Sequence, residues 1–451
     1  MFVVSDLFLN TTISSLTLYC KGSIDNLNET VHRTNEQLDK AFNQRAEQFD
    51  EQKATASLGE HHKCHQALKT SNYESFKDVN PPRAPDTCQW VFQNPTYLKW
   101  RDSLSNSLIW VSADPGCGKS VLSKSLIDID SEKFEPGTSV CHFFFKDNEQ
   151  QNQLNIALCA LLHQIFTREP KLISHAMDLF QRTGDRIQYE TSELWRLLLL
   201  VASKSQALQI VCVLDALDEC RSQDQELLIQ NLCHAFENDR SSGTSEGKAR
   251  LKFLVTSRPY LDIQALFSSL TAKWPQIRLK GEEESDQIKK EIDIVIEIRM
   301  KQLAEKVGLS PEVHQRFQTQ LLQMENRTYL WLHLVLDDIH TTLNESLQPE
   351  AESIKPIPST VDAAYAKILA RVHADQFSTV KKILLIICGA RRPLTIYEMA
   401  IALGITLKPE SSNIRGAQLN IVRLSDRIGG LCGLFVIITD SRIHLLHQTA
   451  K

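Results

Sequence analysis

The sequence predicts an α/β protein built on a doubly wound parallel sheet, with helices before the sheet and two smaller domains after it. Two observations carry this prediction. Between residues 108 and 279, short apolar runs alternate with helical stretches, and the runs lack polar alternation, as in strands buried on both faces. After residue 281 the pattern becomes helical and then ends on two short apolar runs, which indicates separate domains after the sheet.

Five apolar runs are the predicted strands of the sheet, namely Leu108–Ser112, Ser139–Phe145, Gln209–Asp215, Leu251–Ser257 and Gln276–Leu279. Helical patterns such as 154–167 and 193–203 lie between them. The polar stretch 240–250 is expected to be a surface loop, because it is rich in Gly and Ser. Alternating strands and helices of this kind are typical of a parallel sheet with helices on both faces.

The flanking regions are predicted from periodicity and proline content. In the N-terminal region, 1–85, an apolar stripe at steps of 4 and 7 predicts a helix that packs on its own domain or on a partner, with stripe residues Leu27, Val31, Leu38, Phe42 and Phe49. Prolines in 80–87 predict a linker. The sheet domain is then expected over 86–281 and a small helical domain over 282–347. A last domain, 356–451, combines helices with a hairpin, which is the outline of a winged helix.

Composition limits the class of protein. The chain has 451 residues, of which 42% are apolar and 23% charged, as in ordinary soluble proteins. Its eleven cysteines include several inside apolar runs, where they behave as small buried side chains, so a cytoplasmic protein is expected rather than a disulfide framework. The N-terminus lacks the basic segment of a signal peptide, and no apolar stretch is long enough to span a membrane.

The strongest chemical signal is the segment 113–120, which follows a predicted strand and precedes a helix. Gly116 and Gly118 permit positive φ angles, so that successive N–H groups can curl around a phosphate. The N-terminus of the following helix favours the same anion. Lys119 is expected on the β- and γ-phosphates of a nucleoside triphosphate, and the Ser120 hydroxyl on Mg²⁺. The predicted nucleotide-binding residues are Ala113, Gly116, Cys117, Gly118, Lys119, Ser120 and Val121.

Two further strand ends complete the predicted site. Asp215 ends a buried strand and is expected to hold the magnesium ion, directly or through water. Asp218 and Glu219 follow at once, and either can polarise the attacking water. Arg258 lies at the end of another buried strand, which we expect between the strands that bear the phosphate loop and Asp215. Arg258 either reads the γ-phosphate by charge or makes a structural salt bridge.

These motifs carry a family resemblance. The segments "DPGCGKS", "VLDALDEC" and "VTSRPY" together resemble the NACHT class of signal-transduction ATPases, in particular fungal NACHT proteins, which usually carry ankyrin or WD repeats. Similar stretches extend from about Cys64 to the end of the chain. The resemblance implies a nucleotide-binding domain, a helical domain and a winged helix, in that order. It also implies a switch of NOD-like receptor type that is closed with ADP and open with ATP, and that self-associates when open to act on an effector.

The resemblance also assigns residues near the C-terminus. His447 matches a winged-helix histidine that contacts the β-phosphate of ADP in the closed state; a locally packed strand-end histidine is the alternative. The chain ends before the Glu-Phe-Leu segment and the repeats that this family places downstream, so we expect a truncated product or a form without a sensor. The family's adenine-contacting Gly-x-Pro is missing, and residues 326–333 stand at its place.

Two other functions stay open from the sequence. A multi-turnover ATPase would use the same loop, and a measured turnover number separates it from a slow switch. Residues 356–451 contain 12 Lys and Arg against 6 Asp and Glu, which would suit nucleic-acid binding through the winged helix. The overall net charge of −5 disfavours nucleic acid and an anionic membrane surface as partners.

Overall fold

The structure is a computed structural model of the whole chain. It describes residues 29–30, 32–38, 40, 44–45, 58–103, 105–129, 134–239, 250–271, 275–278, 285–325, 327–346, 348–353, 355–407, 419, 421–439 and 441–445. The chain divides into two compact units, Met1–Gln66 and Ala67–Lys451. The described residues of the first unit are helical. Of the apolar stripe predicted there, Leu38 alone lies among the described residues, and its side chain is exposed.

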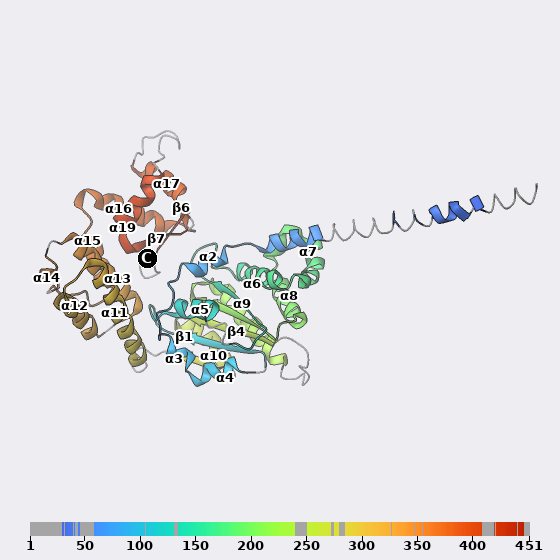
Figure 1. The fold of residues 1–451 in the computed structure, drawn as a ribbon, viewed down its shortest axis with the longest axis horizontal. Coiled ribbons are helices and arrows are strands. Elements are labelled where there is room, and N and C mark those ends of the chain that lie inside the picture. Colours follow the sequence, from blue (N-terminus) through green and yellow to red (C-terminus); the bar gives the residue numbers. More distant parts are fainter. Residues whose placement is uncertain are drawn as a thin grey trace, which may run out of the picture. The chain divides into compact units, whose positions relative to one another are not determined.

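The second unit contains a five-stranded parallel sheet in the order β2-β3-β4-β1-β5 (Figure 1). Its strands are β1 (Ser107–Ser112), β2 (Thr138–Phe144), β3 (Gln209–Asp215), β4 (Arg250–Ser257) and β5 (Gln276–Arg278). All residues of β1 and β3 are buried, as their lack of polar alternation predicts. β4 lies between β1 and β3, so the predicted position of this additional strand is confirmed.

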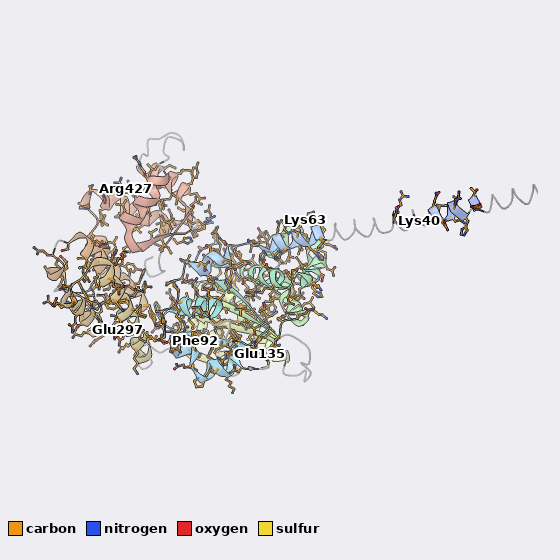
Figure 2. All side chains as sticks on the ribbon, in the orientation of Figure 1. Lys40, Lys63, Phe92, Glu135, Glu297 and Arg427 are labelled. Atoms are coloured by element: carbon orange, nitrogen blue, oxygen red, sulfur yellow. The ribbon has the colours of Figure 1, made fainter. Side chains whose placement is uncertain are left out.

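Helices cover the sheet and connect its strands. They are α2 (Tyr73–Asp78), α3 (Gln89–Phe92), α4 (Pro95–Arg101), α5 (Lys119–Asp128), α6 (Leu154–Arg168), η2 (Pro170–Ala176), α7 (Met177–Thr183), η3 (Gly184–Tyr189), α8 (Thr191–Lys204), η4 (Leu217–Glu219), α9 (Ser222–Asp239) and α10 (Leu261–Thr271). α6 packs on β2, and α8 packs on α6 and β4. Aromatic side chains fill the core beside α3 and α4. Phe92, labelled in Figure 2, meets Tyr97 edge to face with ring centroids 5.6 Å apart.

A helical region follows the sheet, as predicted. It contains α11 (Ser285–Val307), α12 (Pro311–Gln323), α13 (Tyr329–Glu345) and α14 (Pro349–Glu352), and α11 packs on both α12 and α13. The hydroxyl groups of Ser310 and Thr328 cap α12 and α13, because each accepts a hydrogen bond from a backbone N–H of the first turn. These caps fix where the two helices begin.

The C-terminal module, which we define as residues 361–445, combines helices with a small antiparallel sheet. Its elements are α15 (Val361–Ala370), α16 (Ala374–Gly389), β6 (Leu394–Thr395), α17 (Ile396–Leu407), α19 (Ile421–Cys432), η5 (Gly433–Phe435), β7 (Val436–Thr439) and β8 (Arg442–Leu445). The strand order is β6-β8-β7, so the predicted hairpin of β7 and β8 gains a third strand. No helix of the described residues is both long and apolar enough to cross a membrane.

Candidate functional site

The phosphate loop has the backbone that the sequence predicts. β1 ends at Ser112, and α5 begins seven residues later at Lys119. Gly116 and Gly118 have φ angles of 77° and 81°, a region that favours glycine. Gly118 stands at the N-cap of α5 and offers no side chain to close the helix end. The loop therefore presents backbone N–H groups and a helix N-terminus to the same space, which suits an anion.

Lys119 lies over its own loop. Its ammonium group donates hydrogen bonds to the carbonyl oxygens of Ala113 and Asp114, at 2.7 and 3.0 Å. Burial lowers the pKa of this lysine below its ordinary value. Burial raises the pKa of the neighbouring Cys117 thiol to about 11, so that side chain stays uncharged. A phosphate group would give the Lys119 ammonium a stronger partner than two neutral carbonyl oxygens.

Asp215 is a buried carboxylate held by three hydroxyl groups. Ser120 donates to its Oδ2 atom at 2.5 Å, and Ser123 and Thr256 both donate to Oδ1 at 2.7 Å. Burial raises the pKa of Asp215, although the three hydrogen bonds oppose this shift. The Ser120 hydroxyl and the Asp215 carboxylate are hard oxygen donors at one point, which is the donor set that Mg²⁺ prefers. The predicted pair of metal ligands is therefore brought together, and its chemistry fits the ion.

Arg258 and Asp218 form an ion pair beside this point. The Arg258 Nε atom lies 3.2 Å from Asp218 Oδ2, and the Arg258 backbone N–H donates to Asp218 Oδ1 at 3.0 Å. The Asp218 side chain is 2% exposed, so its carboxylate is occupied by the arginine and shielded from the cavity described next. Of the two interpretations of Arg258, the structure contains the salt bridge. A guanidinium held in this way can still face a phosphate with its remaining N–H groups.

Glu219, unlike Asp218, lies in the lining of the cavity beside the predicted metal ligands. It lines a cavity of about 420 Å³ together with Ser120 and Asp215. Its Oε2 atom accepts a hydrogen bond from the backbone N–H of Asp147 at 3.3 Å, and its Oε1 atom lies 3.7 Å from Arg258. Burial, helped by the nearby charge of Asp218, raises the pKa of Glu219 to about 7. A carboxylate with this pKa suits proton transfer at neutral pH.

The C-terminal module contributes two residues to the lining of the same cavity. Arg442 and His444 of β8 both line it, and as alternate residues of one strand they share a face. Ile443 between them is 1% exposed and packs in the core. The predicted phosphate contact, His447, lies outside the described residues. The structure thus brings a different histidine of the same segment, His444, to the lining of the cavity that Ser120 and Asp215 also line.

The N-terminus of α13 lies on the phosphate loop, a contact that the sequence does not predict. The backbone N–H of Tyr329 donates to the Gly116 carbonyl at 3.0 Å. Its hydroxyl group donates to Glu291 Oε2 at 3.0 Å. Glu291 also accepts hydrogen bonds from the backbone N–H groups of Cys88 and Gln89, at 2.6 and 2.7 Å. One buried carboxylate of α11 therefore joins the start of α3, α13 and the phosphate loop.

These contacts predict the effect of replacing Gly118 by alanine. A Cβ atom there would lie 3.2 Å from two carbons of the Tyr329 ring, and the φ angle of 81° is strained for alanine. We expect a loss of about 1–2 kcal/mol in unfolding free energy together with weaker nucleotide binding. The matched control is Gly137→Ala, because Gly137 has φ of 88° but its Cβ would meet its nearest atom at 3.7 Å. Equal nucleotide affinity in both variants, measured by calorimetry, would show that Tyr329 does not support the loop.

The chain is similar to known families and proteins. A family model described as Nephrocystin 3, N-terminal, matches residues 86–258, and a model described as a domain of unknown function (DUF7069) matches residues 288–346. The vegetative incompatibility protein HET-E-1 of Podospora anserina is 26% identical over 371 residues. That match covers 81% of this chain and 26% of the relative, so the chain spans about a quarter of the relative's length.

Two solved structures are weakly similar to this chain. The ORC2 protein of Aeropyrum pernix in its ADP form has a TM-score of 0.37 at 11% identity, over 81% of this chain and 91% of that one. Cdc6p of Pyrobaculum aerophilum has a TM-score of 0.37 at 13% identity, over 82% and 92%. The phosphate loop, the sheet order and the matches to the Nephrocystin 3 model and HET-E-1 confirm the predicted resemblance: the chain has the fold of a P-loop NTPase and is similar to fungal proteins of the NACHT type.

Proposed function

We propose that this protein is a nucleotide-controlled molecular switch, closed when it holds ADP and open when it holds ATP. The observation that carries the proposal is the cavity beside Ser120 and Asp215. Its lining includes residues of the phosphate-binding region together with Arg442 and His444 of the C-terminal module, and residues around α2 complete it. A module that closes over the phosphates is sensitive to the presence of a γ-phosphate in this cavity. A ligand shifts such a balance by its different affinities for the two states.

The residues divide the chemistry of ATP hydrolysis among them. The phosphate loop and Lys119 bind the β- and γ-phosphates, and Ser120 and Asp215 would hold Mg²⁺, which neutralises phosphate charge when bound. The Glu219 carboxylate takes a proton from a water molecule as the water oxygen bonds to the γ-phosphorus. The bond from that phosphorus to the bridging oxygen breaks, and ADP and inorganic phosphate leave. Asp218 positions Arg258. The guanidinium N–H groups that the bonds to Asp218 and Tyr260 leave would bind the γ-phosphate.

The winged-helix interpretation of the C-terminal module, cytoplasmic localisation and self-association in the ATP state belong to the same proposal. The winged-helix interpretation is supported by the module's arrangement of helices with a three-stranded antiparallel sheet, and by the residues of β8 that line the cavity. An effector would then be engaged by the open, self-associated form.

The test is the identity of the bound nucleotide and the speed of its turnover. We expect the purified protein to carry ADP, to exchange it slowly, and to self-associate when loaded with a non-hydrolysable ATP analogue. Turnover is expected well below the 1–10³ s⁻¹ that is typical of enzymes. Mass spectrometry of the released nucleotide and light scattering of the loaded protein measure these outcomes. Sustained turnover within the enzyme range, with no change of mass on loading, would favour a multi-turnover ATPase instead.

A further inference from the structure

The loop between β2 and α6, residues 145–153, contacts the acidic segment after β3. The backbone N–H of Asp147 donates to Glu219 Oε2 at 3.3 Å. The backbone N–H of Arg221 donates to the Asn152 carbonyl at 2.9 Å. The β2–α6 loop is therefore joined to the carboxylate that we propose as the base and to the residue that precedes α9.

Hydrogen bonds inside the β2–α6 loop give it a fixed form. The backbone N–H of Asn148 donates to the Lys146 carbonyl at 2.6 Å, and the Asn148 side chain donates to Gln151 Oε1 at 3.0 Å. The Gln151 side chain donates in turn to the Phe144 carbonyl at the end of β2, at 3.1 Å. Asn148 and Gln151 are 8% and 4% exposed, so their hydrogen bonds are shielded from water. The residues of the loop that contact Glu219 are consequently held in a fixed position relative to the residues of the loop that contact the C-terminal module.

The other side of the same loop contacts the C-terminal module at two places. The Lys146 ammonium donates to the Leu445 carbonyl of β8 at 3.3 Å. The backbone N–H of Glu149 donates to the Arg391 carbonyl at 3.1 Å, and the two side chains lie 3.9 Å apart. The Arg391 side chain is 88% exposed, so its ion pair contributes little. Lys146, in contrast, lines the cavity between the module and the phosphate site.

The charges around Lys146 are mixed. Glu219, Asp215 and Glu149 line the cavity with it, and so do the side chains of Arg442 and His444. Burial lowers the pKa of Lys146, while the charge of Glu219 opposes this shift. Reciprocally, Lys146 and Arg258 lower the pKa of Glu219, against the effects of burial and Asp218. Lys146 thus lies between the proposed base and a strand of the module.

We propose that Lys146 is a positioning residue whose ammonium group is shared between the Leu445 carbonyl and the γ-phosphate side of the cavity. The inference rests on the proposed switch function. In the ADP state the ammonium holds β8 against the β2–α6 loop. A γ-phosphate carries full negative charge and is a stronger acceptor than a neutral carbonyl. ATP therefore draws Lys146 away from Leu445, and this releases the module from the loop.

The charge of Lys146 has a second consequence, because it favours the ionised form of Glu219. An opposite charge within a few ångströms lowers the pKa of a carboxylic acid by about 1–3 units. Burial and the charge of Asp218 raise the pKa of Glu219, so removing the charge of Lys146 would raise this pKa further. Lys146 would then act on hydrolysis through Glu219 as well as on module closure. The two effects make the inference testable by two independent measurements.

The experiment compares Lys146→Met with Lys146→Arg in the full chain. Lys146→Met is expected to release ADP roughly tenfold faster, since a charge-assisted hydrogen bond to β8 is lost. Its preference for ATP over ADP should also fall, because the lost contact with the γ-phosphate is stronger than the lost contact with the Leu445 carbonyl. The acid limb of its hydrolysis profile should move up by about one pH unit. Lys146→Arg keeps the charge and should restore the ATP preference and the acid limb. Arg391→Ala removes the exposed contact of the same loop and should leave the pH profile unchanged.

The outcomes separate the two proposals. If the wild-type protein neither binds nor hydrolyses ATP, the proposed function fails and this inference fails with it. If the wild-type protein does both, but Lys146→Met keeps the wild-type ATP preference and acid limb, the role of Lys146 alone is wrong. A loss in Lys146→Met that Lys146→Arg does not restore would mean that the side chain packs structurally, which also overturns the inference.

Discussion

Replacing Lys119 by alanine is expected to abolish nucleotide binding at concentrations that saturate the wild-type protein. The Lys119 ammonium lies over the phosphate loop, where it is bonded to the carbonyls of Ala113 and Asp114. In the nucleotide complex we expect it to bond to two phosphates. Each charge-assisted hydrogen bond contributes about 1.5–3 kcal/mol, so the loss of both lowers affinity by at least roughly a hundredfold.

The variant is expected to stay folded, because burial already disfavours the charged form of Lys119 and alanine removes this cost. The matched control is Lys124→Ala on the same helix. The Lys124 ammonium lies 2.9 Å from Asp78 at the surface, away from the phosphate loop. Calorimetric titration with ATP and ADP measures both variants. A folded Lys119→Ala protein with wild-type affinity would contradict the assignment of the phosphate loop.

Most of the sheet could be predicted from the sequence, because each strand is buried on both faces and reads as a continuous apolar run. The prediction for Gln209–Asp215 agrees with β3 at both ends, and the predicted 108–112 falls one residue short of β1. The short helices over 170–189 were not predicted. They are stabilised by packing on α6 and α8 rather than by a long periodic stripe. β6 has two residues and too little length to show a period, so it could not be predicted either.

The site could be predicted where its residues are consecutive in the sequence, and could not be predicted where they are far apart. The phosphate loop occupies eight consecutive residues, whose spacing alone predicts its conformation. The contact of Tyr329 with Gly116 joins positions 213 residues apart, and that of Lys146 with Leu445 joins positions 299 apart, so no spacing in the sequence signals them. From the sequence, Glu219 is the expected residue for polarising the water, because it lies one turn beyond Asp215, and Asp218 is the alternative. Arg258 separates their environments, because it binds Asp218 more closely.

Replacing Glu219 by glutamine is the second change from which we expect a large effect. Glutamine keeps the size of the side chain and removes the base, so nucleotide binding should survive while hydrolysis slows by about a hundredfold or more. In the wild-type protein the rate should rise as pH passes through about 7, where Glu219 loses its proton, and in the variant this rise should be absent. The rate and its pH dependence are measured by single-turnover hydrolysis between about pH 5.5 and about pH 8.5, a range that brackets the pKa of Glu219. The control is Glu226→Gln, since Glu226 is exposed on α9.

The same substitution has an independent signature in stability. The pKa of Glu219 is raised from its ordinary 4.5 to about 7, so between these values the folded protein holds a proton that the unfolded chain has released. The stability of the wild-type protein therefore falls as pH rises through this window, by up to about 3 kcal/mol. Glutamine removes that dependence. Without nucleotide, Glu219→Gln should gain unfolding free energy over the wild type from about pH 4.5 to about pH 7. Urea unfolding at several pH values measures the difference in unfolding free energy between the two proteins. A difference that stays constant across this range would contradict the buried position of the carboxylate. Asp218→Asn is the comparison variant, because it loses the ion pair with Arg258 instead.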